Sequence, residues 1–170
     1  PVDDVEQALK LQSNLFESVP LLCGERGGKI ISGFDLGNSP LEYTEEKVND
    51  RTLIFASTNG SVALVKSKQA KTAIVGGFIN FSPVVKFLDR QKDDLLFLCS
   101  GKLNEFCLED AVCAGMIIDQ LAGRKTKTKL ELSDSARAVK ILYQSTKKDL
   151  LKMLHESEHG RYLISLGMKD

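Results

Sequence analysis

The sequence predicts an α/β fold with a mainly parallel sheet, βα repeats and helices on both faces of the sheet, and it allows two small lobes with a site between them. Three observations lead to this prediction. Short apolar runs alternate with helical patterns from residue 52 onward, at intervals of roughly 20 residues. Each run ends in small or polar residues, as parallel strands do before their crossover helices. The composition, with 42% hydrophobic and 27% charged residues in 170, is ordinary for a compact soluble protein.

The first fifty residues predict one helix and two strands. Residues 3–17 predict a helix, because Asp3 or Asp4 can cap it and the apolar residues that follow form a broad face. Residues 19–23 are a short apolar run before a glycine and predict a buried strand. Residues 29–31 predict a further strand, although the glycines on both sides weaken the pattern.

Three strand-and-helix pairs are predicted in the middle of the chain. The strands are expected at residues 52–56, 72–75 and 95–99. The helices that follow them are expected to end near residue 67, to span residues 82–90 and to span residues 108–121. This alternation is typical of a parallel sheet whose strands are joined by crossover helices.

The last third of the chain predicts helices. Residues 125–129 are basic and polar and predict a loop or hinge. From Ser133 to about residue 157, apolar residues keep helical spacing and predict one long helix, with Ser133 or Asp134 as its cap. We expect Gly160 to end or break this helix, and residues 162–166 predict another short one.

The charge balance limits the partners and the location. Twenty-three Lys and Arg match 23 Asp and Glu, so the chain lacks the positive field that attracts nucleic acid or an anionic membrane. Apolar runs such as residues 95–99 are too short to span a bilayer. No charged leader followed by an apolar stretch opens the sequence. We therefore expect a cytoplasmic protein that binds neither nucleic acid nor membrane.

The four cysteines, Cys23, Cys99, Cys107 and Cys113, predict no metal or redox site. No pair has the C-x-x-C spacing of a zinc knuckle or a redox pair. Two of them lie in apolar runs, and we interpret these as small buried residues, which suits a reducing compartment. The C-x-x-x-x-x-R loop of cysteine phosphatases is absent, which argues against a cysteine nucleophile.

The ends of the three predicted middle strands suggest an anion site. Residues 58–61 offer hydroxyls, an amide and an open backbone, Gly76 and Gly77 allow close approach, and residues 100–102 follow the third strand. Backbone N–H groups at helix starts favour phosphate or sulfonate. The alternative is that short βα loops simply need Gly, Ser and Asn for turns and caps, which explains the composition equally well.

Two glycine-rich segments near the start are stronger candidates for function. Residues 24–28 place an acid and a base between three glycines, and residues 33–40 place Asp35, Asn38 and Ser39 in a loop bounded by Gly and Pro. Loops that carry function often look like this, whereas ordinary surface turns are the alternative. Neither segment has the spacing of a P-loop, and no G-x-G-x-x-G follows a strand.

A zinc-binding pattern near the end of the chain is the weakest candidate. Residues 155–159 match H-E-x-x-H, which on a helix places both imidazoles on one face. No further histidine follows His159, and the favoured interpretation is a polar helix end near the negative pole of the helix dipole. A zinc peptidase is kept as a rival function.

The glycine-rich motifs also carry a family resemblance. G-E-R-G-G at residues 24–28, G-F-D-L-G-N-S-P at residues 33–40 and Thr58-Asn59-Gly60 resemble the motif series of the 2-phosphosulfolactate phosphatases. Later segments resemble the same family in the same order, and the similarity covers essentially the whole chain. These segments are residues 77–80, residues 99–101, Glu109-Asp110 with Ala114-Gly115, and residues 157–167.

The resemblance implies a Mg²⁺-dependent phosphatase that converts 2-phospho-3-sulfolactate to 3-sulfolactate and phosphate, a step of coenzyme M biosynthesis in some organisms. Because Mg²⁺ prefers carboxylate oxygens and water, Asp35 and Glu25 are the first candidates for metal ligands, with Asp110 and Glu109 behind them. For Asp110 the alternative is a favourable charge at a helix N-terminus.

Catalysis and substrate binding are assigned on the same resemblance. Asp35, Glu25 and Arg26 are the catalytic candidates, and Arg26 suits bidentate contact with phosphate or sulfonate. The candidate contacts to the small anionic substrate are Asn38, Ser39, Thr58, Asn59, Gly60 and Asn80. Direct attack by a metal-activated water and a covalent phosphoenzyme both remain open.

The chain also departs from the family pattern. Family members carry an Asp and an Arg on an earlier strand with an I-D-V-L-R-A-like run, which has no counterpart here, and the C-terminal region stops soon after Gly167. We expect residues 1–170 to form a single domain of the family without its first strand, with a sub-boundary near residues 124–132 as an alternative. A catalytically incomplete anion-binding or structural fragment is the alternative function, and a homodimer is a further expectation.

Overall fold

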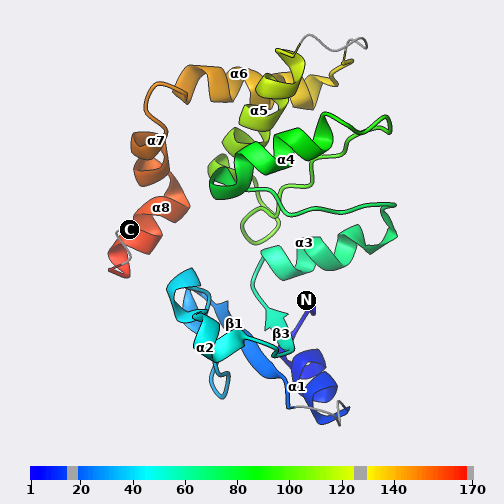
Figure 1. The fold of residues 1–170 in the computed structure, drawn as a ribbon. Coiled ribbons are helices and arrows are strands. Elements are labelled where there is room, and N and C mark those ends of the chain that lie inside the picture. Colours follow the sequence, from blue (N-terminus) through cyan, green and yellow to red (C-terminus); the bar gives the residue numbers. More distant parts are fainter. Residues whose placement is uncertain (15–18, 125–129, 168–170) are drawn as a thin grey trace. The chain divides into compact units, whose positions relative to one another are not determined.

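The computed structural model describes residues 1–14, 19–124 and 130–167. Within these ranges the chain contains eight α-helices and one three-stranded sheet, so the predicted α/β class is confirmed (Figure 1). The chain divides into two compact units, which are described separately. The first comprises Pro1–Ala73 with Lys102–Asn104, and the second comprises Ile74–Gly101 with Glu105–Asp170. The predicted sub-boundary near residues 124–132 stays a prediction, and part of it lies outside the described residues.

The sheet of the first unit has the order β2-β1-β3. β1 (Leu21–Arg26) pairs in parallel with β3 (Leu53–Ala56), as the two apolar runs predicted. β2 (Lys29–Ile30) pairs with the end of β1 in antiparallel orientation, so the sheet is mixed. Its parallel character is confirmed in part, by the β1–β3 pair and by two isolated parallel bridges.

Gly24 allows the close approach of β1 and β3. It has a φ of 142°, and a Cβ added there would lie 1.7 Å from the carbonyl oxygen of Ala56, where no side chain fits. The first glycine of the motif at residues 24–28 therefore has a structural role.

A small core fixes this sheet against the first helix. α1 (Val5–Asn14) confirms most of the helix predicted at residues 3–17, whose last residues lie outside the described part. The core residues are Val2, Ala8, Leu22, Phe34, Ile54 and Ala56. The other helical segments of this unit are η1 (Pro40–Glu42), α2 (Glu45–Val48), α3 (Gly60–Lys66) and η2 (Ser67–Gln69).

The second unit is helical throughout its regular elements. It contains η3 (Phe78–Asn80), α4 (Phe81–Leu88), α5 (Leu108–Ala122), α6 (Asp134–Thr146), α7 (Leu150–Glu156) and α8 (Glu158–Ser165). Its buried core joins α4 to α5 through Val84, Val85, Cys113, Ile117 and Leu121. α5 and α6 approach closely at Gly115, where an added Cβ would lie 2.0 Å from the carbonyl oxygen of Val139.

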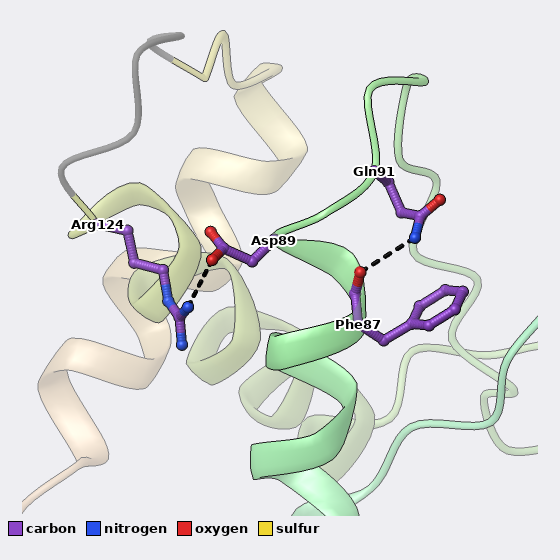
Figure 2. A network of polar contacts seen from close by, with 4 residues as sticks. All are labelled: Phe87, Asp89, Gln91 and Arg124. Atoms are coloured by element: carbon purple, nitrogen blue, oxygen red, sulfur yellow. Dashed lines mark hydrogen bonds and ion pairs between the residues drawn. The ribbon is translucent and has the colours of Figure 1, made fainter.

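The C-terminal ends of α4 and α5 are linked by an ion pair (Figure 2). Arg124 Nη1 lies 2.6 Å from Asp89 Oδ2, and Gln91 Nε2 donates to the carbonyl oxygen of Phe87 at 3.1 Å. Both side chains of the ion pair remain partly exposed, so this contact contributes about 0–1 kcal/mol.

The strands predicted at residues 72–75 and 95–99 are wrong. Both segments lack regular secondary structure, because neither has a neighbouring strand to form a hydrogen-bonded ladder within the described residues. The second segment nevertheless keeps the alternation of an extended chain. Leu95 and Phe97 pack against the core of this unit, whereas Leu96 and Leu98 are 90% and 51% exposed.

The single long helix predicted up to residue 157 is also wrong. It is interrupted between α6 and α7, and the Asp149 side chain caps α7 by accepting a hydrogen bond from Lys152 N at 3.0 Å. The next break is at Ser157 rather than at Gly160, because Ser157 Oγ accepts from Gly160 N and begins α8. Gly160 lies inside α8, where a Cβ would be 1.8 Å from the carbonyl oxygen of Leu154. The loop predicted at residues 125–129 lies outside the described residues.

Candidate functional site

A tight turn at the end of β1 positions Glu25 and Arg26. Arg26 pairs with Lys29, so the connection between β1 and β2 has two residues, Gly27 and Gly28. Both have positive φ, 58° and 71°, which is the backbone of a type I′ hairpin and favours glycine. These two glycines are therefore explained by the turn alone, whereas the charged residues before them are not.

The Glu25 carboxylate is buried and joins this turn to the loop after β3. Glu25 is 8% exposed, its Oε2 accepts from Gly28 N at 2.9 Å, and its Oε1 accepts from Thr58 N at 2.7 Å. Burial acts to raise the pKa of Glu25, but the two backbone hydrogen bonds and the nearby Arg26 outweigh it, so the pKa is lowered. Glu25 is therefore ionised at neutral pH.

Two candidate residues lie beside this carboxylate. The Arg26 guanidinium is half-buried, and its Nη1 donates to the carbonyl oxygen of Glu25 at 2.9 Å. The Thr58 hydroxyl also helps to lower the pKa of Glu25, although its buried Oγ1 makes no hydrogen bond of good geometry to the described atoms. The structure thus brings together a carboxylate, a cation and a buried hydroxyl from two predicted motifs.

The loop that follows β3 closes on itself before α3. Ser57 N donates to Ser61 Oγ at 2.8 Å, and Ser61 N donates to Ser57 Oγ at 2.9 Å. Asn59 is half-buried, and its Oδ1 accepts from Leu103 N at 2.9 Å. Gly60 is exposed and is the first residue of α3.

Asp35 lies at the other end of β1 from Glu25. Its Oδ2 accepts from Leu22 N at 2.8 Å, and its backbone N–H donates to the carbonyl oxygen of Leu22 at 2.8 Å. Leu22 and Glu25 are three residues apart on one strand, or about 10 Å. Asn38 and Ser39 follow on the same loop, exposed and half-buried respectively. The described contacts therefore do not bring Asp35 and Glu25 together as a pair.

The other three candidates belong to the second unit, and their side chains are engaged locally. Asn80 Oδ1 accepts from Gly77 N at 2.7 Å, which orders the turn before α4. Asp110 Oδ2 accepts from Gly101 N at 2.8 Å and from Ser100 Oγ at 3.1 Å. Of the backbone N–H groups that the sequence offered for a substrate anion, those of Thr58, Ser61, Gly77 and Gly101 therefore already donate to oxygens of the chain.

Glu109 links the start of α5 to the junction of α7 and α8. Its Oε1 accepts from Ser157 Oγ, and its Oε2 accepts from Cys107 Sγ at 3.0 Å. Burial acts to raise the pKa of Glu109, but these two hydrogen bonds and the nearby His159 lower it overall. The Asp110 and Glu109 carboxylates thus both have structural partners at the first turn of α5.

The histidine pattern does not form a zinc site. His155 lies on α7 and His159 on α8, with a helix break at Ser157 between them. Across residues 1–14, 19–124 and 130–167, no group of three or more His, Cys, Asp or Glu side chains is placed to share a metal ion.

Binding of Mg²⁺ by the candidate carboxylates stays a prediction. Magnesium takes one or two protein carboxylates and completes its shell with water and phosphate oxygens, so a cluster of three is not required. Glu25 is ionised in a polar, largely buried position, and Asp35 is an exposed carboxylate on the neighbouring loop. Each carboxylate has the oxygen chemistry that Mg²⁺ prefers, but the described contacts do not place the two on one ion.

The four cysteines are free thiols in the structure. None forms a disulfide, and Cys23 and Cys113 are buried whereas Cys99 is exposed. Burial raises the pKa of Cys113 to about 11 and that of Cys107 to about 12, so both are protonated at neutral pH.

Sequence reasoning missed Glu42 and Tyr43, which contact the loop at residues 33–40. Glu42 Oε2 accepts from Gly37 N at 2.8 Å, and Tyr43 Oη donates to the carbonyl oxygen of Gly37 at 2.6 Å. The signal that could have found them is the short spacing from the motif, together with Pro40, which favours a tight turn back toward it.

These features define an α/β protein whose polar loops hold carboxylates, a guanidinium and hydroxyls, the donor set of enzymes that act on small anions. A family model described as 2-phosphosulpholactate phosphatase matches residues 1–170. The chain therefore belongs to this family of phosphatases, as its motifs indicated.

Relatives from three bacteria support this assignment, and each is named probable 2-phosphosulfolactate phosphatase. The protein of Caldanaerobacter subterraneus subsp. tengcongensis is 38% identical over 170 residues, which is 100% of this chain and 69% of the relative. The proteins of Clostridium novyi and Thermotoga maritima are 37% and 36% identical over 170 residues, 100% of this chain and 70% of each relative. In the described part of the chain, no helix has both the length and the apolar character of a membrane span.

Proposed function

We propose that this chain hydrolyses 2-phospho-3-sulfolactate to 3-sulfolactate and inorganic phosphate with the help of Mg²⁺. Membership of the family and the names of its relatives support the substrate. The observation that carries the proposal in this chain is the buried, ionised Glu25 carboxylate, held between the hairpin turn and the loop after β3 and next to Arg26.

Each candidate residue has a role in this proposal. Arg26 pairs with an anionic group of the substrate, since a guanidinium matches the oxygens of phosphate or sulfonate. The buried Thr58 hydroxyl is a proposed donor to the substrate, and Asn38 and Ser39 add contacts from the neighbouring loop. Asn59, Gly60 and Asn80 complete the proposed set of substrate contacts.

Glu25 and Asp35, which the described contacts do not bring together, are proposed as alternative ligands of the metal, and Asp110 and Glu109 of the second unit stay candidate acids. When bound, Mg²⁺ neutralises charge on the phosphoryl oxygens and makes a bound water more acidic. In the reaction an oxygen–phosphorus bond forms to the attacking water, which gives up a proton, or to an enzyme nucleophile whose phosphoryl group water then hydrolyses to release phosphate. The phosphoester bond breaks, and the sulfolactate oxygen leaves with the electron pair and takes up a proton. A cytoplasmic location and a homodimer stay predictions.

Phosphate release from 2-phosphosulfolactate tests the proposal. The wild-type chain is expected to release phosphate with Mg²⁺ and to lose this activity in EDTA. Arg26→Ala and Asp35→Asn are expected to lower kcat/KM by at least about 100-fold, which corresponds to the loss of a charged contact in the transition state. Arg90→Ala is the matched control, because Arg90 is an exposed residue that follows α4. A folded wild-type chain without turnover, or full activity in both variants, would contradict the proposal.

A further inference from the structure

The loop that carries Asp35, Asn38 and Ser39 is fixed to the sheet only as far as Leu36. Leu36 N donates to the carbonyl oxygen of Leu22 at 3.2 Å, and Gly24 N donates to the carbonyl oxygen of Leu36 at 2.9 Å. These bonds place residues 35 and 36 beside β1 in parallel orientation. The residues after Leu36 leave the sheet, so their position depends on other contacts.

The next residue, Gly37, is held at both of its backbone polar groups by two side chains. Its N–H donates to Glu42 Oε2 at 2.8 Å, and its carbonyl oxygen accepts from Tyr43 Oη at 2.6 Å. Both side chains reach back from the end of η1, so they close the loop that begins at Gly37. Asn38 and Ser39 lie inside this closed loop.

The two side chains are themselves anchored. Glu42 N donates to the carbonyl oxygen of Ser39 at 3.0 Å, which fixes the turn from which Glu42 projects. The Tyr43 ring packs against Phe55 of β3, with ring centroids 6.3 Å apart. Burial raises the pKa of Tyr43, so its hydroxyl keeps the proton that it donates to Gly37.

Glycine is the residue that permits this arrangement at position 37. An added Cβ would lie 2.7 Å from Glu42 Oε1, so any other residue would push the Glu42 carboxylate away from the backbone N–H. The absence of a side chain at Gly37 therefore leaves the space that the Glu42 carboxylate occupies.

We propose that Glu42 and Tyr43 are positioning residues, which hold the backbone N–H and carbonyl of Gly37 and thereby present Asn38 and Ser39 to the anionic substrate. This inference rests on the proposed function, because it gives Asn38 and Ser39 a substrate to contact. It assigns a role to two residues outside the motif at residues 33–40, and neither of them needs to touch the substrate.

Two variants remove the contacts one at a time. Tyr43→Phe removes the donor to the Gly37 carbonyl oxygen and keeps the ring that packs on Phe55, whereas Glu42→Ala removes the acceptor for the Gly37 N–H. Glu42→Gln keeps an acceptor oxygen and serves as the conservative rescue. The matched controls are Tyr143→Phe, on α6 of the other unit, and Glu46→Ala, an exposed residue of α2.

Steady-state kinetics give a measurement that a merely structural role would not change. Tyr43→Phe and Glu42→Ala are expected to raise KM for 2-phosphosulfolactate about 3- to 10-fold and to leave kcat within about twofold, because a displaced loop weakens ground-state and transition-state binding alike. Glu42→Gln is expected to restore KM to within about twofold of the wild-type value. The controls are expected to match the wild-type chain.

Two measurements that need no turnover accompany the kinetics. Hydrogen exchange of the Gly37 amide, followed by NMR, is expected to accelerate about 3- to 10-fold in Glu42→Ala, which loses the acceptor of this amide, and in Tyr43→Phe, which frees the carbonyl of the same residue. Titration with 3-sulfolactate is expected to shift the Asn38 and Ser39 amide signals of the wild-type chain and to shift them less in these two variants.

The outcomes separate this inference from the proposed function. If the wild-type chain turns over and both variants keep its KM, the positioning role is wrong and the proposed function stands. A second outcome is that the wild-type chain does not turn over, but 3-sulfolactate shifts its Asn38 and Ser39 amide signals more than it shifts those of Glu42→Ala and Tyr43→Phe. In that case the proposed function fails and the positioning role stands. If 3-sulfolactate shifts neither signal in the wild-type chain, the positioning role is wrong whether or not the chain turns over.

Discussion

Replacing Glu25 with glutamine separates the charge of this side chain from its shape. In the native chain each carboxylate oxygen accepts one backbone amide, from Gly28 at 2.9 Å and from Thr58 at 2.7 Å, and the residue is only 8% exposed. Glutamine has one oxygen and one NH₂ group at the same positions. Whichever way the amide is turned, one backbone N–H then faces another donor.

The expected cost follows from these two contacts. One charge-assisted hydrogen bond is lost, its backbone donor stays buried without a partner, and the other bond becomes neutral. Together these changes lower the free energy of unfolding by about 2–4 kcal/mol. Glu25→Ala leaves both amides without an acceptor, and its expected cost is higher, about 3–5 kcal/mol.

Urea unfolding followed by circular dichroism measures this cost. The midpoint is expected to fall while the slope stays constant, which indicates a change in stability rather than in the surface exposed on unfolding. Glu46→Gln, at an exposed position on α2, is the control and is expected to change the free energy by less than about 0.5 kcal/mol. A Glu25→Gln chain as stable as the wild-type chain would refute the argument that the carboxylate holds the two loops.

Three further predictions follow from contacts described above. Gly24→Ala is expected to prevent the pairing of β1 and β3, because the new Cβ would lie 1.7 Å from a backbone oxygen. The free energy of unfolding is expected to fall by more than about 4 kcal/mol, seen as an unfolded circular dichroism spectrum. Gly27→Ala is expected to cost only about 1–2 kcal/mol for its positive φ, because nothing lies within 4 Å of a Cβ added there. Ser157→Ala is expected to lower the free energy of unfolding by about 1–3 kcal/mol, since it removes both the cap of α8 and the donor to Glu109, and an unchanged urea midpoint would contradict the link. The folded-state pKa values of Glu25 and Glu109 are lowered from 4.5, so the stability that these residues contribute is present above pH 4.5 and is lost as the pH falls below this value. Thermal melts at several pH values measure this loss. If the Glu25→Gln chain loses as much stability on acidification as the wild-type chain, the role of Glu25 is contradicted.

The elements with a strong local pattern could be predicted from the sequence. The first helix has a capping aspartate and an apolar face, and its residues from Val5 to Asn14 form a helix. The runs around Leu22 and Ile54 are short and apolar, and they pair in parallel. In these cases the side chains that give the pattern are also the ones that the core buries, so the local and tertiary preferences agree.

The strand expected at residues 95–99 shows what such a pattern lacks. The run is apolar throughout and predicted a strand, but only Leu95 and Phe97 pack against the core, because a strand also needs a neighbour with matching backbone groups. Nothing in a single apolar run specifies that neighbour. The helix break at Ser157 was not predicted, because glycine is the usual helix breaker and the sequence therefore favoured Gly160. In the structure Gly160 instead allows the backbone of Leu154 to approach α8.

The candidate site was predictable in its residue types and less so in its contacts. The motif drew attention to Glu25, Arg26 and Thr58, which the structure brings together through hydrogen bonds and charge. It gave no sign that Asp35 would be tied to Leu22 at the other end of the strand. A hydrogen bond between a side chain and a distant backbone group produces no periodic pattern in a sequence, so these contacts could not be predicted.

The occupied loop amides have a consequence for how any ligand can bind. Glu25 accepts from the N–H groups of Gly28 and Thr58, and Asp110 accepts from that of Gly101. A dissolved anion that uses one of these amides must therefore compete with a tethered carboxylate, whose effective concentration is of the order of millimolar or higher. The measured affinity is then the intrinsic affinity multiplied by the fraction of time in which the carboxylate has moved away. Such an internal competitor discriminates against weak, singly charged anions and favours ligands that carry several anionic groups at once.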